Sequence, residues 1–526
     1  MSQSKLNYTI ASIFIALPWC SSIAQKSKSP NILIIMTDQQ RWDALRYSGA
    51  NDIIQTPNLD KLAREGAYFS QANSPCPVSG PARTSILTGR LIETTGIRTN
   101  MDSDNEKKCD YKTFDQILAS NGYVSEYIGK FHSPMDMARV YSNPPLYGYK
   151  VPELIKNWEK LYHFYLNENT KKRQPNSGEL IDFSFFDGTT YKPSPIDRRF
   201  DKQQAGQIVD AEFKKRPLSQ PDHNGTLNLD SEFSITAVQG KQTIEAIEQL
   251  KKKKFVITCS FHCPHSPILP TEPFASIYKA SEMPIPKSIS DKMDGSPYIN
   301  ANGRLSMPEY ADSAKIGYMM ANYYALVTEI DSWVGKILNK LDELKLRDNT
   351  LIIFMSDHGE MLGAHGMREK NVFLEESVRV PLIMNYPSKI SSRKIDTPVS
   401  TIDVFSTILD YAGIKVESDG YSLRKLANGE APNTDFAISE WNWESQQTPN
   451  LMIRTKDWKL MISKNNNQKN LDALYDIKND PYELNNLLFS KKEKYQEMAE
   501  LLKMKLYNYL IKVKYSYAED IKQRKF

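Results

Sequence analysis

Four short apolar segments, each followed by polar and reactive side chains, constrain the fold of this chain more than any other feature. The segments cover residues 31–36, 124–129, 255–260 and 351–355. Strands that are apolar on both faces are typical of parallel sheets covered by helices on both sides. Helical patterns over residues 234–250 and 314–344 precede the last two segments, so helices and strands alternate. The sequence therefore predicts an α/β fold with a doubly wound sheet, which binds ligands at the carboxyl ends of its strands.

Composition divides the rest of the chain into a long insertion and a smaller C-terminal part. Residues 133–230 are rich in tyrosine, asparagine, proline and charged side chains, which favours an insertion that lies over the ligand-binding edge of the sheet. From residue 416 the pattern changes to short strand-like segments, such as residues 451–455 and 458–462, followed by a lysine-rich helix from Lys491. We therefore predict a catalytic domain over residues 25–415 and an α+β subdomain over residues 416–526.

The first 24 residues have the pattern of a signal peptide. Lys5 supplies a positive charge, residues 10–17 form a mostly apolar run too short to span a bilayer, and residues 22–24 form a small-x-small cleavage site. This pattern predicts an exported, periplasmic protein. A surface lipoprotein attached through Cys20 is the alternative, and the Pro-Trp pair before that cysteine argues against it. No later stretch reaches the roughly 18 apolar residues of a transmembrane helix, so we do not expect an integral membrane protein.

Charge and cysteine content exclude other classes of protein. The chain has 67 basic and 63 acidic side chains, and so small an excess is no signature of nucleic-acid binding. Five cysteines in 526 residues are too few for a disulfide-stabilised scaffold. Four of them follow the predicted signal peptide, and for these one disulfide and free buried thiols are both open. These counts leave an ordinary globular enzyme or binding protein.

The densest motif lies in residues 76–90, CPVSGPARTSILTGR. Residues 79–83, Ser-Gly-Pro-Ala-Arg, followed by Leu-Thr-Gly at 87–89, resemble the signature of type I, formylglycine-dependent sulfatases. That signature has Cys or Ser, any residue, Pro, Ser or Ala, then Arg. Counting back four positions from Arg83 gives Ser79 and not Cys76. The resemblance therefore implies the serine type, in which a radical sulfatase-maturing enzyme oxidises Ser79 to formylglycine. For the pentapeptide alone, an unmodified serine at a helix N-terminus stays open.

The resemblance covers residues 30–490 and implies an alkaline-phosphatase-like mixed sheet with one divalent metal site. Asp38 and Gln39 follow the first strand, where the family has its first two metal ligands, and Ser79 completes the site. Many sulfatases have two aspartates at the first position, but an amide oxygen also coordinates hard cations. The remaining ligands correspond to Asp357 and His358. We expect Ca²⁺, and Mg²⁺ stays open because imidazole is a less usual donor for calcium.

Three further motifs resemble the sulfatase pocket. Residues 129–132, Gly-Lys-Phe-His, are similar to the family's Gly-Lys-Trp-His, and residues 264–267, Pro-His-Ser-Pro, are similar to its Pro-His-x-Pro. Lys370 matches a lysine downstream of the Asp-His-Gly motif. The resemblance therefore implies six catalytic residues: Ser79, Arg83, Lys130, His132, His265 and Lys370.

The family resemblance also implies a role for each residue. Arg83, Lys130 and Lys370 would join the metal in offsetting the charge of the sulfate. One hydroxyl of the hydrated formylglycine, activated by the metal and Asp357, would attack sulfur. His265 would protonate the departing alcohol, and His132 would deprotonate the second hydroxyl so that sulfate is expelled. An unmodified serine has no second hydroxyl, so its sulfated form would be trapped.

The substrate is less constrained by the sequence. Export, the tyrosine-rich insertion and the habits of the family favour a sulfated carbohydrate, such as a fragment of a glycosaminoglycan or of a mucin-type glycan. Arg98, Trp441, Trp443 and Glu444 are candidates for binding it, and plain packing is the alternative for each.

Three alternative functions stay open. A phosphomonoester or phosphonate hydrolase of the alkaline phosphatase superfamily would use Ser79 directly with two metals, but only one metal site is evident. A non-catalytic glycan-binding relative would have lost some of the residues that are intact here. A transferase would replace water by a sugar hydroxyl.

Overall fold

The computed structural model describes residues 29–104, 107–134, 183–184, 190–191, 224–227, 230–266, 268–299, 308–441, 450–463 and 472–526. The predicted signal peptide, the alternative lipid attachment at Cys20 and most of the predicted insertion lie outside these residues. Within the described part, no helix is long and apolar enough to cross a membrane.

A seven-stranded mixed sheet forms the centre of the molecule, in the order β11-β2-β10-β9-β1-β8-β4. β9, β1, β8 and β4 run parallel, whereas β10 is antiparallel to both of its neighbours. The strands are β1 (Asn31–Asp38), β2 (Ala67–Phe69), β4 (Val124–Gly129), β8 (Phe255–Pro264), β9 (Thr350–Ser356), β10 (Leu382–Asn385) and β11 (Arg393–Ile395). β11 pairs parallel with β2, so β10 alone among these strands runs in the opposite direction. The four predicted strands are confirmed, and they are the adjacent parallel strands β9, β1, β8 and β4.

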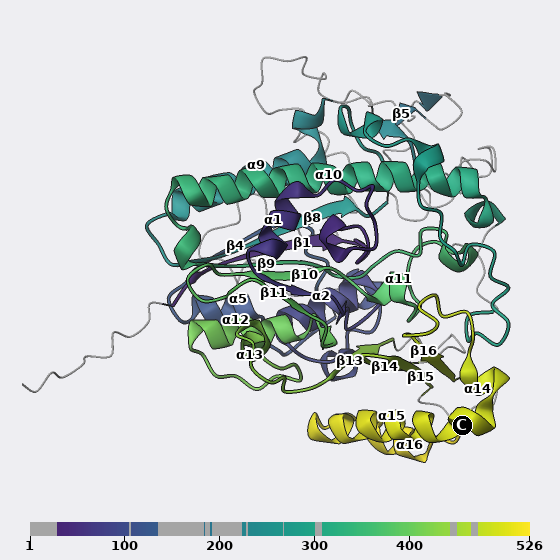
Figure 1. The fold of residues 1–526 in the computed structure, drawn as a ribbon. Coiled ribbons are helices and arrows are strands. Elements are labelled where there is room, and N and C mark those ends of the chain that lie inside the picture. The colour runs from purple at the N-terminus through teal and green to yellow at the C-terminus, as the bar shows by residue number, and fades with distance from the viewer. Residues whose placement is uncertain are drawn as a thin grey trace, which may run out of the picture.

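Helices cover both faces of this sheet (Figure 1). One face carries α1 (Pro57–Arg64), α9 (Ile235–Leu250) and α10 (Ser313–Glu343). The other carries α2 (Ser79–Thr88), α5 (Phe114–Ala119) and α12 (Asp403–Ala412). The shorter helices are α3 (Ile92–Thr95), α4 (Asn100–Asp104), α11 (Glu375–Val378) and α13 (Arg424–Ala427). The predicted doubly wound α/β architecture is confirmed.

The alternation of side chains along β1 explains why both faces must be covered. Leu33 and Ile35 belong to the apolar cluster that includes α1, α9 and α10. Ile32, Ile34 and Met36 belong to the cluster that includes α2, α5 and α12. At most 1% of any of these five side chains is exposed. Burying side chains of this size contributes about 1.5–3 kcal/mol each, so β1 is stabilised from both sides.

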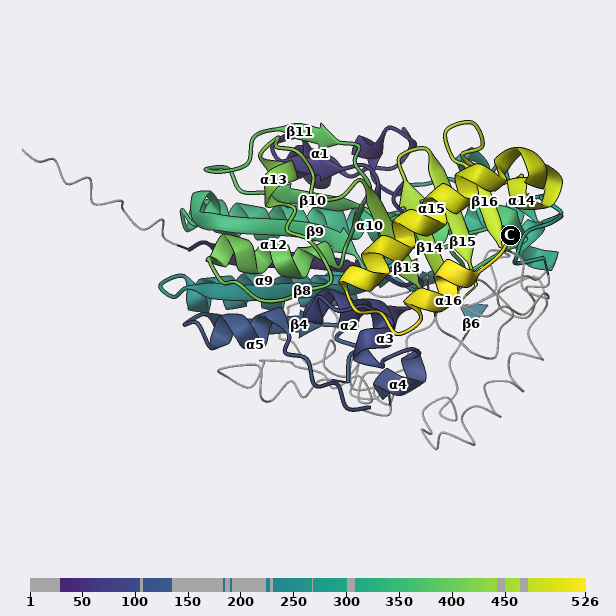
Figure 2. The same cartoon turned by 90° about the horizontal axis from the view of Figure 1, so that it is seen from below.

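The C-terminal part contains a four-stranded antiparallel sheet. Its strands are β13 (Phe436–Glu440), β14 (Leu451–Thr455), β15 (Trp458–Ile462) and β16 (Ala473–Asp476). Figure 2 shows α15 (Lys492–Lys512) and α16 (Ala518–Gln523) in yellow over this sheet, and their apolar side chains share a cluster with it. Three further short elements of the chain are β3 (Ala72–Asn73), β12 (Val399–Ser400) and α14 (Leu487–Ser490). This arrangement confirms an α+β C-terminal part, while its boundary at residue 416 stays a prediction.

The described pieces of the insertion form a small three-stranded sheet of β5 (Phe183–Ser184), β6 (Thr190–Tyr191) and β7 (Thr226–Leu227). Single bridges join Asn224 to Ile268 and Leu227 to Thr271. The described end of the insertion therefore adjoins the segment that follows β8.

The cysteines of the described residues form no disulfide. Cys76, Cys109, Cys259 and Cys263 are all free thiols, and all but Cys109 are buried. The cysteine content left one disulfide and free thiols open, and the structure shows free thiols at these four positions.

Candidate active site

The register of the parallel strands brings the predicted site residues to one edge of the sheet. Thr37 of β1 pairs with Ser356 of β9, so Asp38 and Asp357 leave neighbouring strands at the same level. On the other side of β1, the amide N–H of Lys130 donates to the Ser260 carbonyl at 2.9 Å, just beyond the end of β4. Reactive side chains from segments far apart in the sequence thus lie close together at the carboxyl ends of the strands, as the fold class predicts.

Arg83 holds this edge together from the first turns of α2. Its Nε donates to Asp357 Oδ2 at 2.7 Å, and its Nη2 donates to Asp38 Oδ2 at 3.1 Å. Its Nη1 donates both to the Lys130 carbonyl at 2.7 Å and to Ser260 Oγ at 2.8 Å. The guanidinium is fully buried, and only a rigid fork of donors can serve these acceptors together.

Ser79 is the first residue of α2 and directs its hydroxyl to His358. The two side chains are 2.7 Å apart, from Oγ to Nε2. His358 Nδ1 lies 2.9 Å from the Gly359 carbonyl, which can only accept, so Nδ1 carries the proton and Nε2 the lone pair. Burial lowers the pKa of His358, which favours this neutral form. Imidazole in this tautomer is the form that ligates metals.

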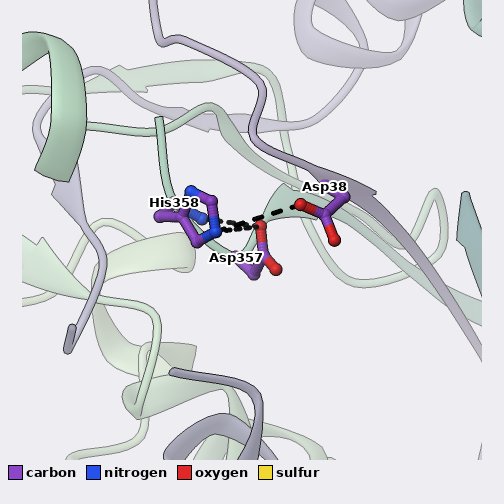
Figure 3. A group of neighbouring side chains, drawn as sticks. All are labelled: Asp38, Asp357 and His358. Carbon is purple, nitrogen blue, oxygen red and sulfur yellow. Dashed lines mark hydrogen bonds and ion pairs between the residues drawn. The ribbon is translucent and has the colours of Figure 1, made fainter. Parts of the chain in front are cut away.

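Asp38, Asp357 and His358 form a group that fits a metal ion (Figure 3). One donor atom from each lies within 4.8 Å of the other two, and all three residues are buried. Asp38 Oδ1 has no hydrogen-bond partner among the described residues, although burial of an unsatisfied carboxylate oxygen is costly. Two carboxylates and one imidazole suit a divalent cation, so the donor set and the orphaned oxygen both fit the predicted metal.

Lys130 approaches Asp38 from the end of β4. Its ammonium forms an ion pair with Asp38 Oδ2 and donates to Ser79 Oγ at 3.5 Å. Burial lowers the pKa of Lys130, although Asp38 opposes that shift. The preceding Gly129 has a φ of 92°, and a Cβ there would lie 2.0 Å from the Ser260 carbonyl oxygen. Glycine is therefore required at this position so that the chain can turn Lys130 into the site.

Lys370 and His265 form a second polar group beside Gln39. Lys370 Nζ contacts His265 Nε2 at 3.1 Å and Glu369 at 3.0 Å, and it donates to Gln39 Oε1. Burial opposes the charge of Lys370, but Glu369 and other carboxylates outweigh it and raise its pKa. Burial and the charge of Lys370 hold the pKa of His265 well below its usual range. His265 is therefore neutral, and its Nδ1 faces the Ser266 carbonyl at 2.7 Å.

His132 lies two residues beyond Lys130 in a left-handed conformation, with a φ of 49°. It is buried, and it is among the residues whose charge affects His262. Burial, together with neighbouring charges such as Lys130, lowers the pKa of His262 to about 3. Two further histidines therefore lie at this end of the sheet.

The candidates for substrate binding do not all join this group. Arg98 lies shortly before α4 and pairs with Glu93. α4 contacts the start of α2, where the Gly80 amide donates to Asn100 Oδ1. Trp441 is only 4% exposed and belongs to an apolar cluster with Cys76, a position that favours packing over stacking on a sugar. Trp443 and Glu444 lie outside the described residues. Their substrate roles stay predictions.

The structure adds residues that the motifs did not indicate. Ser260 binds Arg83, His262 lies beside His265 with ring centroids 5.5 Å apart, and the buried Glu360 contacts Gln39. For Ser260 and His262 a signal existed, since both lie at the end of a predicted strand. Glu360 closely follows the Asp-His-Gly motif, but that motif gives no reason to expect its side chain to turn inward.

Comparisons with known proteins agree with this geometry. A model of the sulfatase family matches residues 30–414, and a model of the C-terminal region of N-sulphoglucosamine sulphohydrolase matches residues 363–512. An N-acetylglucosamine-6-O-sulfatase of Bacteroides thetaiotaomicron is 28% identical, over 91% of this chain and 86% of its own. An arylsulfatase of Clostridium perfringens is 27% identical, over 90% of this chain and 93% of its own.

Solved structures show the same fold. A protein crystallised with its substrate D-glucosamine-2-N,6-O-disulfate has a TM-score of 0.66 and 23% identity, over 94% of this chain and 100% of its own. A phosphonate monoester hydrolase from Silicibacter pomeroyi has a TM-score of 0.70 and 20% identity, over 92% of this chain and 95% of its own. At such identities the likeness concerns the fold alone, and it confirms the alkaline-phosphatase-like architecture. The family match covers most of the chain, and this protein therefore belongs to the sulfatase family, as a sulfuric ester hydrolase.

Proposed function

We propose that this sulfatase hydrolyses a sulfate ester on a carbohydrate, such as a fragment of a glycosaminoglycan or of a mucin-type glycan. The observation that carries the reaction is the position of Ser79. Its Oγ lies 2.7 Å from His358 Nε2 and 3.5 Å from Lys130 Nζ, at the N-terminus of α2 and beside the candidate metal group. The relatives named for N-acetylglucosamine-6-O-sulfatase and endo-4-O-sulfatase activity support the carbohydrate class.

Two groups beyond the side chains complete the proposed site. Asp38, Gln39, Asp357 and His358 would hold a metal, Ca²⁺ in preference to Mg²⁺, which would supply Lewis-acid stabilisation of the sulfate oxygens. Formylglycine, made from Ser79 by a serine-type maturing enzyme, would supply a hydrate with one hydroxyl to attack sulfur and another whose loss of a proton releases sulfate.

The charged side chains then bind and orient the sulfate. Lys130 and Lys370 approach the site from two sides, and their ammonium groups offset the charge that repels a nucleophile. Arg83 is held by both aspartates and by two further acceptors, so it fixes the ligands of the metal. This preorganisation would hold the nucleophile in a fixed position when the ester binds.

Proton transfer is assigned to histidines and one lysine. In the free protein His265 is neutral and its Nε2 accepts from Lys370, so we place the protonation of the leaving alcohol at this pair. Glu369 and other carboxylates raise the pKa of Lys370, so Lys370 is the member of this pair that carries the exchangeable proton. His132 would take the proton that must leave before sulfate is expelled.

The mass of the tryptic peptide that contains Ser79 tests the maturation step. Protein from cells with a serine-type maturing enzyme should show a peptide that has lost two hydrogens and reacts with a hydrazine reagent. An unmodified Ser79 in such cells would contradict the proposal, and phosphate and phosphonate esters would be assayed next.

Ser79→Ala tests the nucleophile, with Ser85→Ala as its matched control. Both serines are buried in α2, but Ser85 Oγ has no hydrogen-bond partner among the described residues, whereas Ser79 Oγ contacts His358 and Lys130. Turnover of sulfated sugars should vanish in Ser79→Ala and persist in Ser85→Ala, while both variants fold. Full activity of Ser79→Ala would refute the mechanism.

A further inference from the structure

All four polar groups of Gln39 have partners. Its backbone N–H donates to Asp357 Oδ1 at 3.0 Å, and its carbonyl accepts from the Tyr323 hydroxyl at 2.6 Å. Its side-chain Nε2 donates to Glu360 Oε2, and its Oε1 accepts from Lys370 Nζ. The backbone has a φ of 68°, a conformation that costs free energy for a residue with a Cβ. This set of contacts holds a strained residue in one position.

Glu360 is built into the fold as an acceptor. It is fully buried, and its Oε1 accepts the backbone amides of Leu362 at 3.1 Å and Glu369 at 2.6 Å. Arg368 Nε lies 3.6 Å from the same oxygen. The other oxygen, Oε2, receives the Gln39 amide. A carboxylate held in this way can only accept, so its neighbour must present hydrogens.

We propose that Glu360 is a positioning residue, which sets the orientation of the Gln39 carboxamide. By accepting from Nε2, it turns Oε1 toward Lys370, whose ammonium interacts electrostatically with Asp38 of the metal group. A flipped amide would place its oxygen against the Glu360 carboxylate and its NH₂ group against the Lys370 ammonium, and both contacts are repulsive. An amide oxygen has two lone pairs, so Oε1 can accept from Lys370 and also coordinate a metal. The metal part of this inference rests on the proposed function.

The same contact explains why an amide occupies this position. A carboxylate at residue 39 would face the buried carboxyl group of Glu360, whose pKa is already raised by burial. Two like charges in contact are strongly unfavourable, so one of the two groups would have to take up a proton. Exchanging the two side chains, in Gln39→Glu with Glu360→Gln, restores one donor facing one acceptor. The fold should therefore tolerate the double substitution but neither of the two single substitutions.

Titration calorimetry with Ca²⁺ alone, on the metal-depleted full chain, tests the metal part. Glu360→Gln should weaken Ca²⁺ binding by roughly 10–100-fold, as loss of outer-shell partners does. The double variant should regain at least the affinity of the wild type, because a carboxylate is the stronger ligand. Glu360→Asp keeps the charge but withdraws it by one methylene, so it should resemble Glu360→Gln.

Thermal melting without metal tests the pairing independently of the function. Each single variant should melt below the wild type and the double variant should recover. If a single variant fails to fold, a folded double variant gives the same support. Glu329→Gln is the matched control, since Glu329 is also buried, its pKa is raised to about 7 by burial, and it contacts Ser234 rather than Gln39.

Additive losses in the double variant, or single variants that melt and bind Ca²⁺ like the wild type, would overturn the proposal. A wild type that binds no Ca²⁺ would instead refute the proposed metal site. The melting temperatures would still decide whether Glu360 orients Gln39.

Discussion

Arg83 connects the ends of two strands and the middle of a third through one side chain. It binds Asp38 at the carboxyl end of β1, Asp357 directly after β9, and Ser260 within β8. Each acceptor is buried, so each would lose free energy if its donor were removed. The positions of the proposed ligands therefore depend on the shape of this guanidinium and not only on its charge.

We expect Arg83→Lys to reduce kcat/KM by about a hundredfold or more, because one ammonium cannot hold the two aspartates in register. Steady-state assays on a sulfated sugar measure the loss, and thermal melting shows whether the variant folds. Arg90→Lys is the control, since Arg90 pairs with Asp419 outside the site. Equal effects of the two substitutions would show that the fork of Arg83 has no special role.

His265→Ala should harm substrates with poor leaving groups more than activated aryl sulfates. A sugar alkoxide needs a proton as it departs, whereas a phenolate with a low pKa does not. The comparison is kcat/KM for a sugar sulfate and for an aryl sulfate, in the variant and in the wild type. Equal losses on both substrates would remove His265 from the proton-transfer step.

A buried group of charges joins the C-terminal sheet to α11. Lys459 of β15 is fully buried and pairs with Glu375 at 2.8 Å and Glu483 at 2.7 Å. Its ammonium also donates to the Phe373 carbonyl at 2.9 Å. The charge of Arg454 helps to hold the pKa of Glu375 well below its usual range despite burial. The C-terminal sheet is thus connected to α11 by a group of buried charges, and removing one of them leaves its partners unpaired.

Lys459→Met should lower the free energy of unfolding by about 3–5 kcal/mol, because two buried carboxylates lose a cation. Denaturant unfolding followed by tryptophan fluorescence measures the change. Lys456→Met, at an exposed residue between β14 and β15, should have little effect. A similar stability for both variants would contradict this account of the cluster.

Elements with a strong local signal could be predicted from the sequence, and those held by tertiary pairing could not. The predicted strand-like segments 451–455 and 458–462 have the same bounds as the observed strands β14 and β15, because turn residues separate them. β2 and β10 were not predicted, since strands of three or four residues are too short to show a hydrophobic periodicity in the sequence. The predicted strand over residues 255–260 extends to Pro264, which carries it to the His265 motif.

At the scale of the whole molecule, the buried histidines make stability depend on pH. The pKa of His262 is lowered to about 3, against about 6.5 in an unfolded chain, so unfolding takes up a proton between these values. Its contribution is present above pH 6.5 and is lost as the pH falls. His365 has the opposite sign: burial opposes its charge, but Asp291 raises its pKa, so its contribution is lost as the pH rises.

His262→Gln should therefore flatten the fall in stability between about pH 6 and pH 4, by about 1.4 kcal/mol per pH unit for one proton. Unfolding free energies at several pH values measure the slope. His365→Gln should change the profile in the opposite direction. An unchanged slope in His262→Gln would show that this imidazole is protonated in the folded chain.

The site as a whole was more predictable than its internal contacts. The motifs indicated Ser79, Arg83, Lys130 and Asp357 because each has a fixed offset from a strand or a glycine. They did not indicate Glu360, because its role depends on a side chain that turns inward from a loop. Sequence motifs thus identify the residues that do chemistry, and only the structure shows which residues hold them in place.

Every residue of α2 is buried, and Ser79 is only 1% exposed. An enzyme that oxidised this serine would need to draw it into its own catalytic centre, which the closed fold forbids. The modification would therefore have to precede folding, while the chain is still extended during synthesis or export. The activity of a preparation would then depend on whether Ser79 is modified before the chain folds. An unmodified chain that has already folded would stay inactive even when the maturing enzyme is present.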